Sequence, residues 1–430
     1  MNTSKKISII SLGCPKNTVD SEILKGGLLE KGFIYSDDPA DADTVVINTC
    51  GFIEEAREES VDTILNMLDL KNNNSIRRVL VAGCMSERYK IEMERSLPEV
   101  DAIYGVNAQH EILAYLLNEK VSSCESLYPR SLMTPSHYAY LKIAEGCDNQ
   151  CSFCSIPLMR GTQKSVEVDK ILSEAEYLHQ IGVRELILIA QDLTRYGTDL
   201  DTGVRLPDLL NELLSLQLFP WVRLLYNNPD HWNMRVNELF VKFPALCPYI
   251  DLPIQHASDR ILKKMNRGKN QKQIREIVRS IRGEIPNVAI RTSVLVGFPG
   301  ETDEDFDILQ DFIEEMRFER LGVFTYSEEE GTTAAQLSDN IPQDEKEYRK
   351  DIIMRLQYDI SNEYAISKID EKISVIIDRS ENDNFIGRSV WDAPDIDCTV
   401  KIISDKSHEV GDICKASVIG TQDFDLICKN

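Results

Sequence analysis

The sequence contains a stretch, Cys147-Asp-Asn-Gln-Cys151-Ser-Phe-Cys154, in which three cysteines follow one another at C-x3-C-x2-C spacing. Three thiolates at this spacing can bind one metal centre from a single loop. A structural zinc site would need a fourth Cys or His, and the next thirty residues contain only His179, inside a helical pattern. Three soft ligands instead favour a 4Fe-4S cluster with one open iron. A zinc loop, or three unconnected thiols, is the alternative.

The loop, with Phe153 inside it and the apolar run 138–143 before it, resembles the radical S-adenosylmethionine (SAM) superfamily. The resemblance implies that the open iron on Cys147, Cys151 and Cys154 binds SAM and that Phe153 belongs to the cofactor site. It also implies cleavage of SAM to methionine and a 5′-deoxyadenosyl radical. The electron for this step would come from a reductant such as flavodoxin or ferredoxin.

Composition limits the kind of protein this is. The 430 residues suffice for two to four domains. Their net charge of −23 and pI near 4.8 oppose a broad phosphate-binding surface and favour a cationic partner. Eleven scattered cysteines indicate metal-binding thiols in a reduced cytoplasm rather than a disulfide framework. No apolar run approaches the roughly 20 residues that a membrane span needs, so no membrane association is expected.

Residues 1–124 alternate short apolar runs with helical patterns, which predicts a parallel α/β domain. The runs are 7–12, 44–47 and 79–82, and they lead into Cys14, Cys50 and Cys84 respectively. Since the carboxyl ends of parallel strands share one edge, these three cysteines should converge and form a second three-thiolate site. The alternative is that each cysteine is a small buried residue that closes a strand.

Residues 137–360 are predicted to form a second α/β domain, in which repeated βα units favour a parallel barrel or a doubly wound sheet. The apolar runs are 138–143, 185–190, 222–226, 249–254, 288–296 and 321–326. The resemblance to the radical SAM superfamily implies that these six units form its partial (β/α)6 barrel.

Polar residues on or after these strands are candidate cofactor contacts. Gln191 and Asp192 follow the second strand, and similar loops in the superfamily bind SAM; a helix N-cap in a surface loop is the alternative. Tyr226 lies at a strand carboxyl end, where such folds bind ligands. Arg291 stands in a strand otherwise too apolar for it, and the resemblance assigns that strand to the adenosine pocket. His256 suits a structural role as well as a site role.

Residues 363–430 alternate in period two after a charged helical segment, which predicts a small β-barrel. This part resembles the TRAM module, usually an RNA-binding element. Its 14 acidic and 8 basic residues argue against RNA and for a basic protein target. Asp392, Asp395 and Asp397, beside an exposed Trp391, are predicted to bind that substrate. They could alternatively only keep a loop solvated.

The order of these three parts resembles the methylthiotransferases, a radical SAM family that inserts sulfur and then methylates it. Gly13-Cys14-Pro15-Lys16-Asn17 and Asn48-Thr-Cys50-Gly51-Phe52-Ile53 resemble its ribosomal-protein branch. This implies two 4Fe-4S clusters, two SAM molecules, and methylthiolation of an aspartate β-carbon on small-subunit ribosomal protein twelve. The cluster on the first three cysteines would carry the sulfur. A tRNA adenosine methylthiotransferase and a non-catalytic iron–sulfur or zinc protein are the alternatives.

Overall fold

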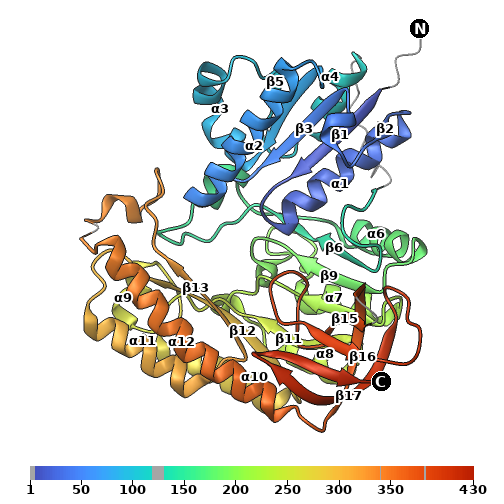
Figure 1. The fold of residues 1–430 in the computed structure, drawn as a ribbon. Coiled ribbons are helices and arrows are strands. Elements are labelled where there is room, and N and C mark those ends of the chain that lie inside the picture. The colour runs from blue at the N-terminus through green and yellow to red at the C-terminus, as the bar shows by residue number, and fades with distance from the viewer. Residues whose placement is uncertain (1–4, 119–129, 339, 382–383) are drawn as a thin grey trace. The chain divides into compact units, whose positions relative to one another are not determined.

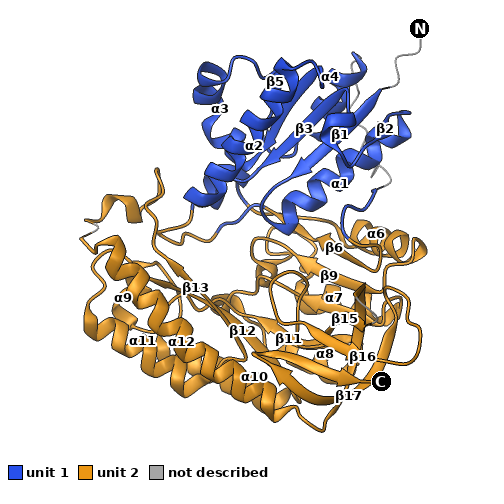
Figure 2. Cartoon of the chain, in the orientation of Figure 1, with its two compact units in different colours: residues 1–134, 146–148, 155–162 blue, residues 135–145, 149–154, 163–430 orange. Residues whose placement is uncertain are grey.

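The computed structural model in Figure 1 describes residues 5–118, 130–338, 340–381 and 384–430. Residues 125–129, which lie between the predicted domains 1–124 and 137–360, are outside these ranges. The chain divides into two compact units (Figure 2), and we describe each by itself. Unit 1 comprises residues 1–134, 146–148 and 155–162, and unit 2 comprises residues 135–145, 149–154 and 163–430. The predicted division into 1–124, 137–360 and 363–430 stays a prediction.

Unit 1 is built on a five-stranded sheet in the order β2-β1-β3-β4-β5, with parallel pairing throughout. The strands are β1 (Lys6–Ser11), β2 (Ile34–Tyr35), β3 (Thr44–Thr49), β4 (Arg78–Gly83) and β5 (Ala102–Ile103). This confirms the predicted parallel α/β domain. The strands read as continuous apolar runs because helices cover both faces of the sheet.

Alternate residues of the central strands enter two separate cores. Val46 and Leu80 pack with α1 (Pro15–Glu30) and α4 (Gln109–Leu117) on one face. On the other face, Val45 and Val79 pack with helices α2 (Glu54–Asn72) and α3 (Cys84–Ser96). The period of two along each strand therefore gives this sheet two buried faces.

Unit 2 contains a six-stranded parallel sheet in the order β13-β12-β11-β10-β9-β6. The strands are β6 (Tyr138–Lys142), β9 (Glu185–Ile189), β10 (Trp221–Leu224), β11 (Leu246–Asp251), β12 (Ala289–Val296) and β13 (Arg320–Thr325). The principal helices are α6 (Val168–Gln180), α7 (Leu206–Ser215), α8 (Arg235–Lys242), α10 (Gln271–Glu284), α11 (Asp303–Met316) and α12 (Gln343–Ser367). All six predicted strands are present, and a capping box formed by Thr302 and Asp305 begins α11.

The carboxyl-terminal part of unit 2 is a closed five-stranded barrel in the order β14-β15-β16-β18-β17. Its strands are β14 (Lys372–Glu381), β15 (Asn384–Ser389), β16 (Val400–Ile403), β17 (Ile413–Gln422) and β18 (Asp425–Lys429). The predicted small β-barrel is confirmed. Residues near the amino ends of the six-stranded sheet pack against it: Trp221 and Cys247 share an apolar cluster with Ile376.

Buried ion pairs join the terminal barrel to the same edge of the sheet. Glu185, the first residue of β9, accepts hydrogen bonds from Arg223 Nε at 2.8 Å and pairs with Arg388 at 2.7 Å. Asp378 accepts from Arg388 Nε at 2.9 Å and lies 2.7 Å from His137 Nε2. We call these five residues the amino-edge network. Although burial opposes it, Arg388 and Arg223 hold the pKa of Glu185 below its usual range.

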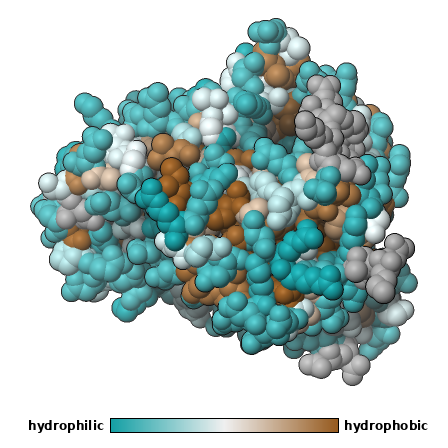
Figure 3. Space-filling model, turned by 90° about the horizontal axis from the view of Figure 1, so that it is seen from above, coloured by the Kyte–Doolittle hydropathy of each residue, from teal (hydrophilic) through white to brown (hydrophobic). Residues whose placement is uncertain are grey.

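The surface is mixed in hydropathy. On the face seen in Figure 3, hydrophobic side chains form patches between hydrophilic ones. Across the described ranges, no helix is both long enough and apolar enough to cross a membrane.

Candidate metal centres

Three cysteines follow three neighbouring strands of unit 1. Cys14 precedes α1, Cys50 follows β3 directly, and Cys84 follows β4 as the first residue of α3. Since β1, β3 and β4 are adjacent and parallel, the cysteines lie at one edge of the sheet. We call them the strand-end set. Burial raises the pKa of Cys50, and electrostatic repulsion from Cys14 adds to this effect.

The backbone at this edge approaches the thiols closely. A Cβ atom built on Gly13, whose φ is +83°, would lie 2.6 Å from Cys50 Cβ and 2.7 Å from its Sγ. A Cβ on Gly83, with φ +103°, would lie 2.4 Å from Asn48 Oδ1. Only glycine fits these two positions, and at Gly13 this lets the backbone pack directly against Cys50.

The asparagine Asn17 organises the strand-end set. Its side chain is fully buried, and its Nδ2 donates to Leu12 O at 2.8 Å and to Thr49 O at 3.0 Å. Cys84 Sγ donates to its Oδ1 at 3.7 Å. One side chain thus ties together the segments that carry all three cysteines.

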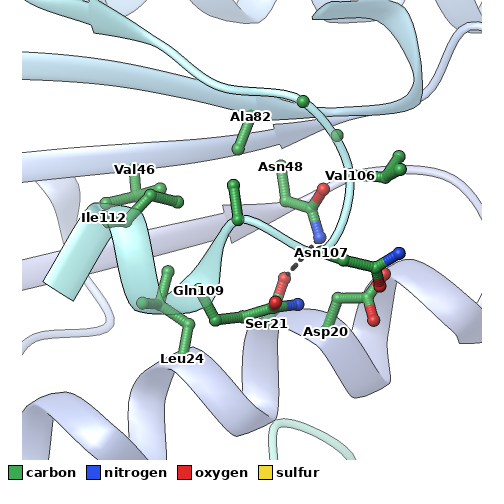
Figure 4. Close-up of a pocket in the computed structure, with 13 residues that line it drawn as sticks. Asp20, Ser21, Leu24, Val46, Asn48, Ala82, Val106, Asn107, Gln109 and Ile112 are labelled. Carbon is green, nitrogen blue, oxygen red and sulfur yellow. Dashed lines mark hydrogen bonds between the residues drawn. The ribbon is translucent and has the colours of Figure 1, made fainter. Parts of the chain in front are cut away.

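A pocket adjoins this edge, and Figure 4 shows its lining. Asn48 Nδ2 donates to Ser21 Oγ at 2.9 Å, which is the bond drawn there. Asp20 and Gly83 also line the pocket. The polar side of the pocket is therefore continuous with the residues that surround Cys84.

Burial raises the pKa of the Cys84 thiol to about 11, while the guanidinium of Arg160 opposes that rise. Arg160 Nε lies 3.2 Å from Cys84 Sγ. The sequence interpretation did not include Arg160, and it used Asn17 only as part of a motif that carries the family resemblance. The only signal for Arg160 was a cationic side chain beside Gly161 in a segment that is otherwise apolar.

The second set of cysteines, Cys147, Cys151 and Cys154, is called the loop set here. Cys147 belongs to unit 1, where its N–H donates to Gly161 O at 3.0 Å. Cys151 and Cys154 belong to unit 2, where Cys154 N–H donates to Cys151 O at 3.2 Å and forms a turn. Both are partly exposed, whereas Cys147 is buried.

Unit 2 anchors its part of this loop through backbone bonds. Ser152 donates to Met265 O at 3.0 Å and accepts from Ala334 N at 2.7 Å. Phe153 packs against a core that includes Met265 and Phe298. Arg267 Nη1 lies 3.6 Å from Cys151 Sγ, a contact that the sequence did not reveal. The aromatic residue inside the motif therefore orients the loop by packing.

Within the described residues, no group of three or more His, Cys, Asp or Glu side chains is arranged so that it could hold a metal ion. The donor chemistry of both sets nevertheless suits iron–sulfur clusters, since each set supplies three thiols, the ligands that such clusters prefer.

Gln191 and Asp192 lie directly after β9. Gln191 Nε2 donates to Glu145 Oε1 at 2.5 Å, whereas its buried Oε1 has no hydrogen-bond partner among the residues the structure describes. Asp192 accepts from Asn149 Nδ2 at 2.6 Å and caps a short helical turn through Thr194 N at 3.0 Å. The N-cap predicted as the alternative is therefore present, together with a bond to the cysteine loop.

Tyr226 adopts a left-handed backbone, with φ +64°, after β10. Its N–H donates to Asp251 Oδ2 at 2.8 Å. His256 is fully buried, and its Nδ1 accepts from Ser258 N at 2.9 Å. This bond supports the structural alternative for His256.

Arg291 is placed differently from the prediction. Its Nη1 donates to Asp251 Oδ1 at 2.9 Å, and its Nε lies 3.5 Å from Asp397 Oδ1 of the terminal barrel. The guanidinium is therefore engaged by two carboxylates, and the cofactor contacts proposed below exclude it. The isolated basic residue of this apolar strand is thus explained by its ion pairs with Asp251 and Asp397.

The predicted exposed substrate patch is wrong. Trp391 is buried, and Asp392 is 1% exposed and pairs with Arg320 at 2.6 Å. The side chain of Asp397 is 2% exposed and accepts from Tyr249 Oη at 2.7 Å. Asp395 is exposed but accepts from Tyr138 Oη at 3.2 Å. These carboxylates bind the six-stranded sheet, because its strands present basic and phenolic partners.

Comparison with known families divides the chain into three matched segments. Residues 6–105 match the family described as uncharacterized protein family UPF0004, residues 141–313 match the radical SAM superfamily, and residues 369–429 match the TRAM domain.

Full-length relatives are also found. A ribosomal protein uS12 methylthiotransferase RimO from Clostridium tetani is 41% identical, over 99% of this chain and 98% of the relative. The protein of the same name from Christiangramia forsetii is 44% identical, over 98% of this chain and 93% of the relative. Among solved structures, the radical SAM methyltransferase TsrM from Kitasatospora setae aligns with a TM-score of 0.55 at 15% identity. That alignment covers 74% of this chain and 73% of TsrM, and it supports the fold alone.

Proposed function

The chain belongs to the family of ribosomal protein uS12 methylthiotransferases, which are radical SAM enzymes, and we propose that it methylthiolates the β-carbon of an aspartate on that ribosomal protein. The observation that carries this proposal is the identity of more than 40% over nearly the whole chain. The acidic character of the protein, with its net charge of −23, suits a basic ribosomal protein as substrate.

We assign the radical chemistry to the loop set. Cys147, Cys151 and Cys154 would hold a 4Fe-4S cluster whose fourth iron stays open for SAM. When bound there, the cluster and SAM supply the radical that takes hydrogen from the substrate carbon. The chain fixes the loop through the backbone bonds of Ser152 and the packing of Phe153.

Three further residues are proposed to contact SAM. Gln191 offers a buried carbonyl oxygen that lacks a hydrogen-bond partner among the described residues and can accept from an amino or hydroxyl group. Asp192, just after the carboxyl end of β9, accepts a hydrogen bond from Asn149 of the cysteine loop and so connects this strand end to the loop. Tyr226 is held at a strand end by Asp251 in a backbone conformation that is uncommon for tyrosine.

The strand-end set would hold a second cluster, which carries or delivers the sulfur. Its residues suit this role because the three cysteines follow neighbouring parallel strands at one edge of the sheet, and glycine at position 13 lets the backbone pack directly against Cys50. The chain's contribution there is to hold the thiols through Asn17 and to supply a cationic donor, Arg160. A flavodoxin or ferredoxin is proposed as the electron donor, and RNA contact by the terminal barrel is not part of the proposal.

The test is anaerobic reconstitution of the protein with iron and sulfide, followed by incubation with SAM, a reductant and small ribosomal subunits. We expect 5′-deoxyadenosine, measured by chromatography, and a methylthio group on one aspartate of uS12, measured by peptide mass spectrometry. A methylthio group on tRNA adenosine instead would assign the chain to a different substrate. A loaded protein that forms no 5′-deoxyadenosine would refute the enzymatic function.

A further inference from the structure

A buried arginine that follows the loop set contacts a thiol of the strand-end set. Arg160 ends α5 (Ile156–Arg160), which begins two residues after Cys154. Its side chain is 2% exposed, and its Nε donates to Cys84 Sγ at 3.2 Å. Arg160 and Cys84 both lie in unit 1, so the contact lies within one compact body.

The guanidinium is fixed from its other side by α1. Nη1 pairs with Asp20 Oδ2 at 3.0 Å, and Nη2 donates to Asn17 Oδ1 at 2.5 Å. Asn17 is in turn held by two backbone carbonyls. Because the guanidinium is planar, partners at Nη1 and Nη2 determine the direction of Nε. The donor therefore points at the sulfur as a consequence of the fold of α1.

The charges around Cys84 are nearly isolated from water. Asp20, whose side chain is 7% exposed, places one carboxylate against the positive charge of Arg160. A thiolate ligand at Cys84 would receive a charge-assisted hydrogen bond from the same guanidinium. Hydrogen bonds to ligand sulfurs and nearby charge help to set the reduction potential of an iron–sulfur cluster. A cation stabilises the reduced, more negative state, and a carboxylate destabilises it.

We propose that Arg160 is a positioning residue that raises the reduction potential of the cluster on the strand-end set, and that Asp20 opposes it. This inference rests on the proposed function, because it requires a cluster on Cys14, Cys50 and Cys84. It assigns opposite electrostatic effects to two residues that form one ion pair.

The experiment uses the full chain with Cys147→Ala, Cys151→Ala and Cys154→Ala as the parent, so that only the strand-end cluster remains. Iron and sulfide are assayed, and the potential is measured by redox titration followed by electron paramagnetic resonance. Arg160→Met should shift the potential to more negative values, and Asp20→Asn should shift it to more positive values. Arg160→Lys keeps the charge and should restore part of the shift.

The matched control is Arg130→Met. Arg130 is also buried in unit 1 and donates through Nε to Glu22 Oε2, on α1, at 2.7 Å. This variant removes an equally buried ion pair from the same helix, so it should lower thermal stability without moving the potential. A purely structural role for Arg160 would make the effects of Arg160→Met and Arg130→Met alike.

The outcomes distinguish failure of the proposed strand-end cluster from failure of the proposed role of Arg160. A parent without iron would overturn the strand-end cluster and the inference together. A loaded parent whose potential is unchanged by Arg160→Met, or shifted in the same direction by Asp20→Asn, would overturn the inference alone. If Arg160→Met does not fold, the other two variants still test the inference. Asp20→Asn should shift the reduction potential to more positive values, whereas Arg160→Lys should stay near the potential of the parent.

Discussion

The two sets of cysteines differ in how the chain brings them together. The strand-end set comes from three strands and is positioned by a sheet, a buried asparagine and a glycine. The loop set comes from eight consecutive residues whose spacing alone keeps the thiols near one another. In the strand-end set two cysteines are buried and Cys14 is partly exposed, whereas in the loop set Cys147 is buried and the other two are partly exposed.

This difference suggests a division of labour. A partly exposed loop suits a site that must admit a small cofactor and a protein substrate. A buried set suits a group whose potential and sulfur chemistry are controlled by fixed neighbours. Removing the thiols of one set should therefore affect different chemistry from removing those of the other.

The largest effect is expected from removal of the loop set. Cys147→Ala, Cys151→Ala and Cys154→Ala together should lower 5′-deoxyadenosine formation to background, because no site for the open iron remains. Iron content should fall by roughly half, from about eight irons expected for two cubes. Chromatography and an iron assay measure both quantities. Full iron content in this variant, or zinc in the wild-type protein, would contradict the assignment.

Removal of the strand-end set should have a narrower effect. Cys14→Ala, Cys50→Ala and Cys84→Ala together should preserve 5′-deoxyadenosine formation and abolish the methylthio product on uS12. The reason is that the two sets occupy separate segments and would supply different chemistry. Peptide mass spectrometry and chromatography on the same reaction provide the measurement. If a folded variant that holds half of the iron forms neither 5′-deoxyadenosine nor the methylthio product, the two sets of cysteines do not have separate roles.

The sequence predicted both sets because their signals are local. An apolar run that ends in glycine and cysteine is visible without a structure, and so is a C-x3-C-x2-C loop. The parallel order of the strands then follows from alternation with helices, and the six strands of unit 2 were located within a few residues.

The errors arose where tertiary pairing decides the environment. Asp392 and Asp397 stand in a polar stretch that looks like a solvated loop. Their partners Arg320 and Tyr249 are far away in the sequence, so the ion pair and the hydrogen bond could not be inferred from spacing. The ion pairs of Arg291 could not be inferred for the same reason, because one of its carboxylate partners belongs to the terminal barrel.

A smaller effect, on the strand-end set alone, is expected from Gly13→Ala. The new Cβ would meet Cys50 Sγ at 2.7 Å in a left-handed backbone, so overpacking should cost roughly 1–3 kcal/mol beyond the strain of the backbone. Iron on the strand-end set should fall while 5′-deoxyadenosine formation persists. Gly32→Ala is the matched control, since its φ is +79° and no heavy atom of the described residues lies within 4 Å of its Cβ. Equal iron content in both variants would show that Gly13 does not keep space for the thiols.

The smallest effect should come from the amino-edge network, which contains neither set of cysteines. Although burial opposes it, His137 and Arg388 hold the pKa of Asp378 below its usual range. A carboxyl whose pKa is lowered by folding adds stability above its unfolded value of about 3.9 and loses it as pH falls through the folded value. Asp378→Asn should therefore lower the stability of chelator-treated protein by about 1 kcal/mol at pH 7, since the carboxyl is partly exposed. This difference from wild type should shrink as pH falls below about 4, because the carboxyl becomes protonated first in the unfolded chain and at lower pH in the folded protein. Denaturant unfolding followed by circular dichroism at several pH values measures this difference in stability.

In reconstituted protein at neutral pH, Asp378→Asn should hold as much iron as wild type. A difference that stays constant down to pH 2 would mean that the charge of Asp378 does not stabilise the fold. A loss of iron would mean that the terminal barrel influences the cysteine sets.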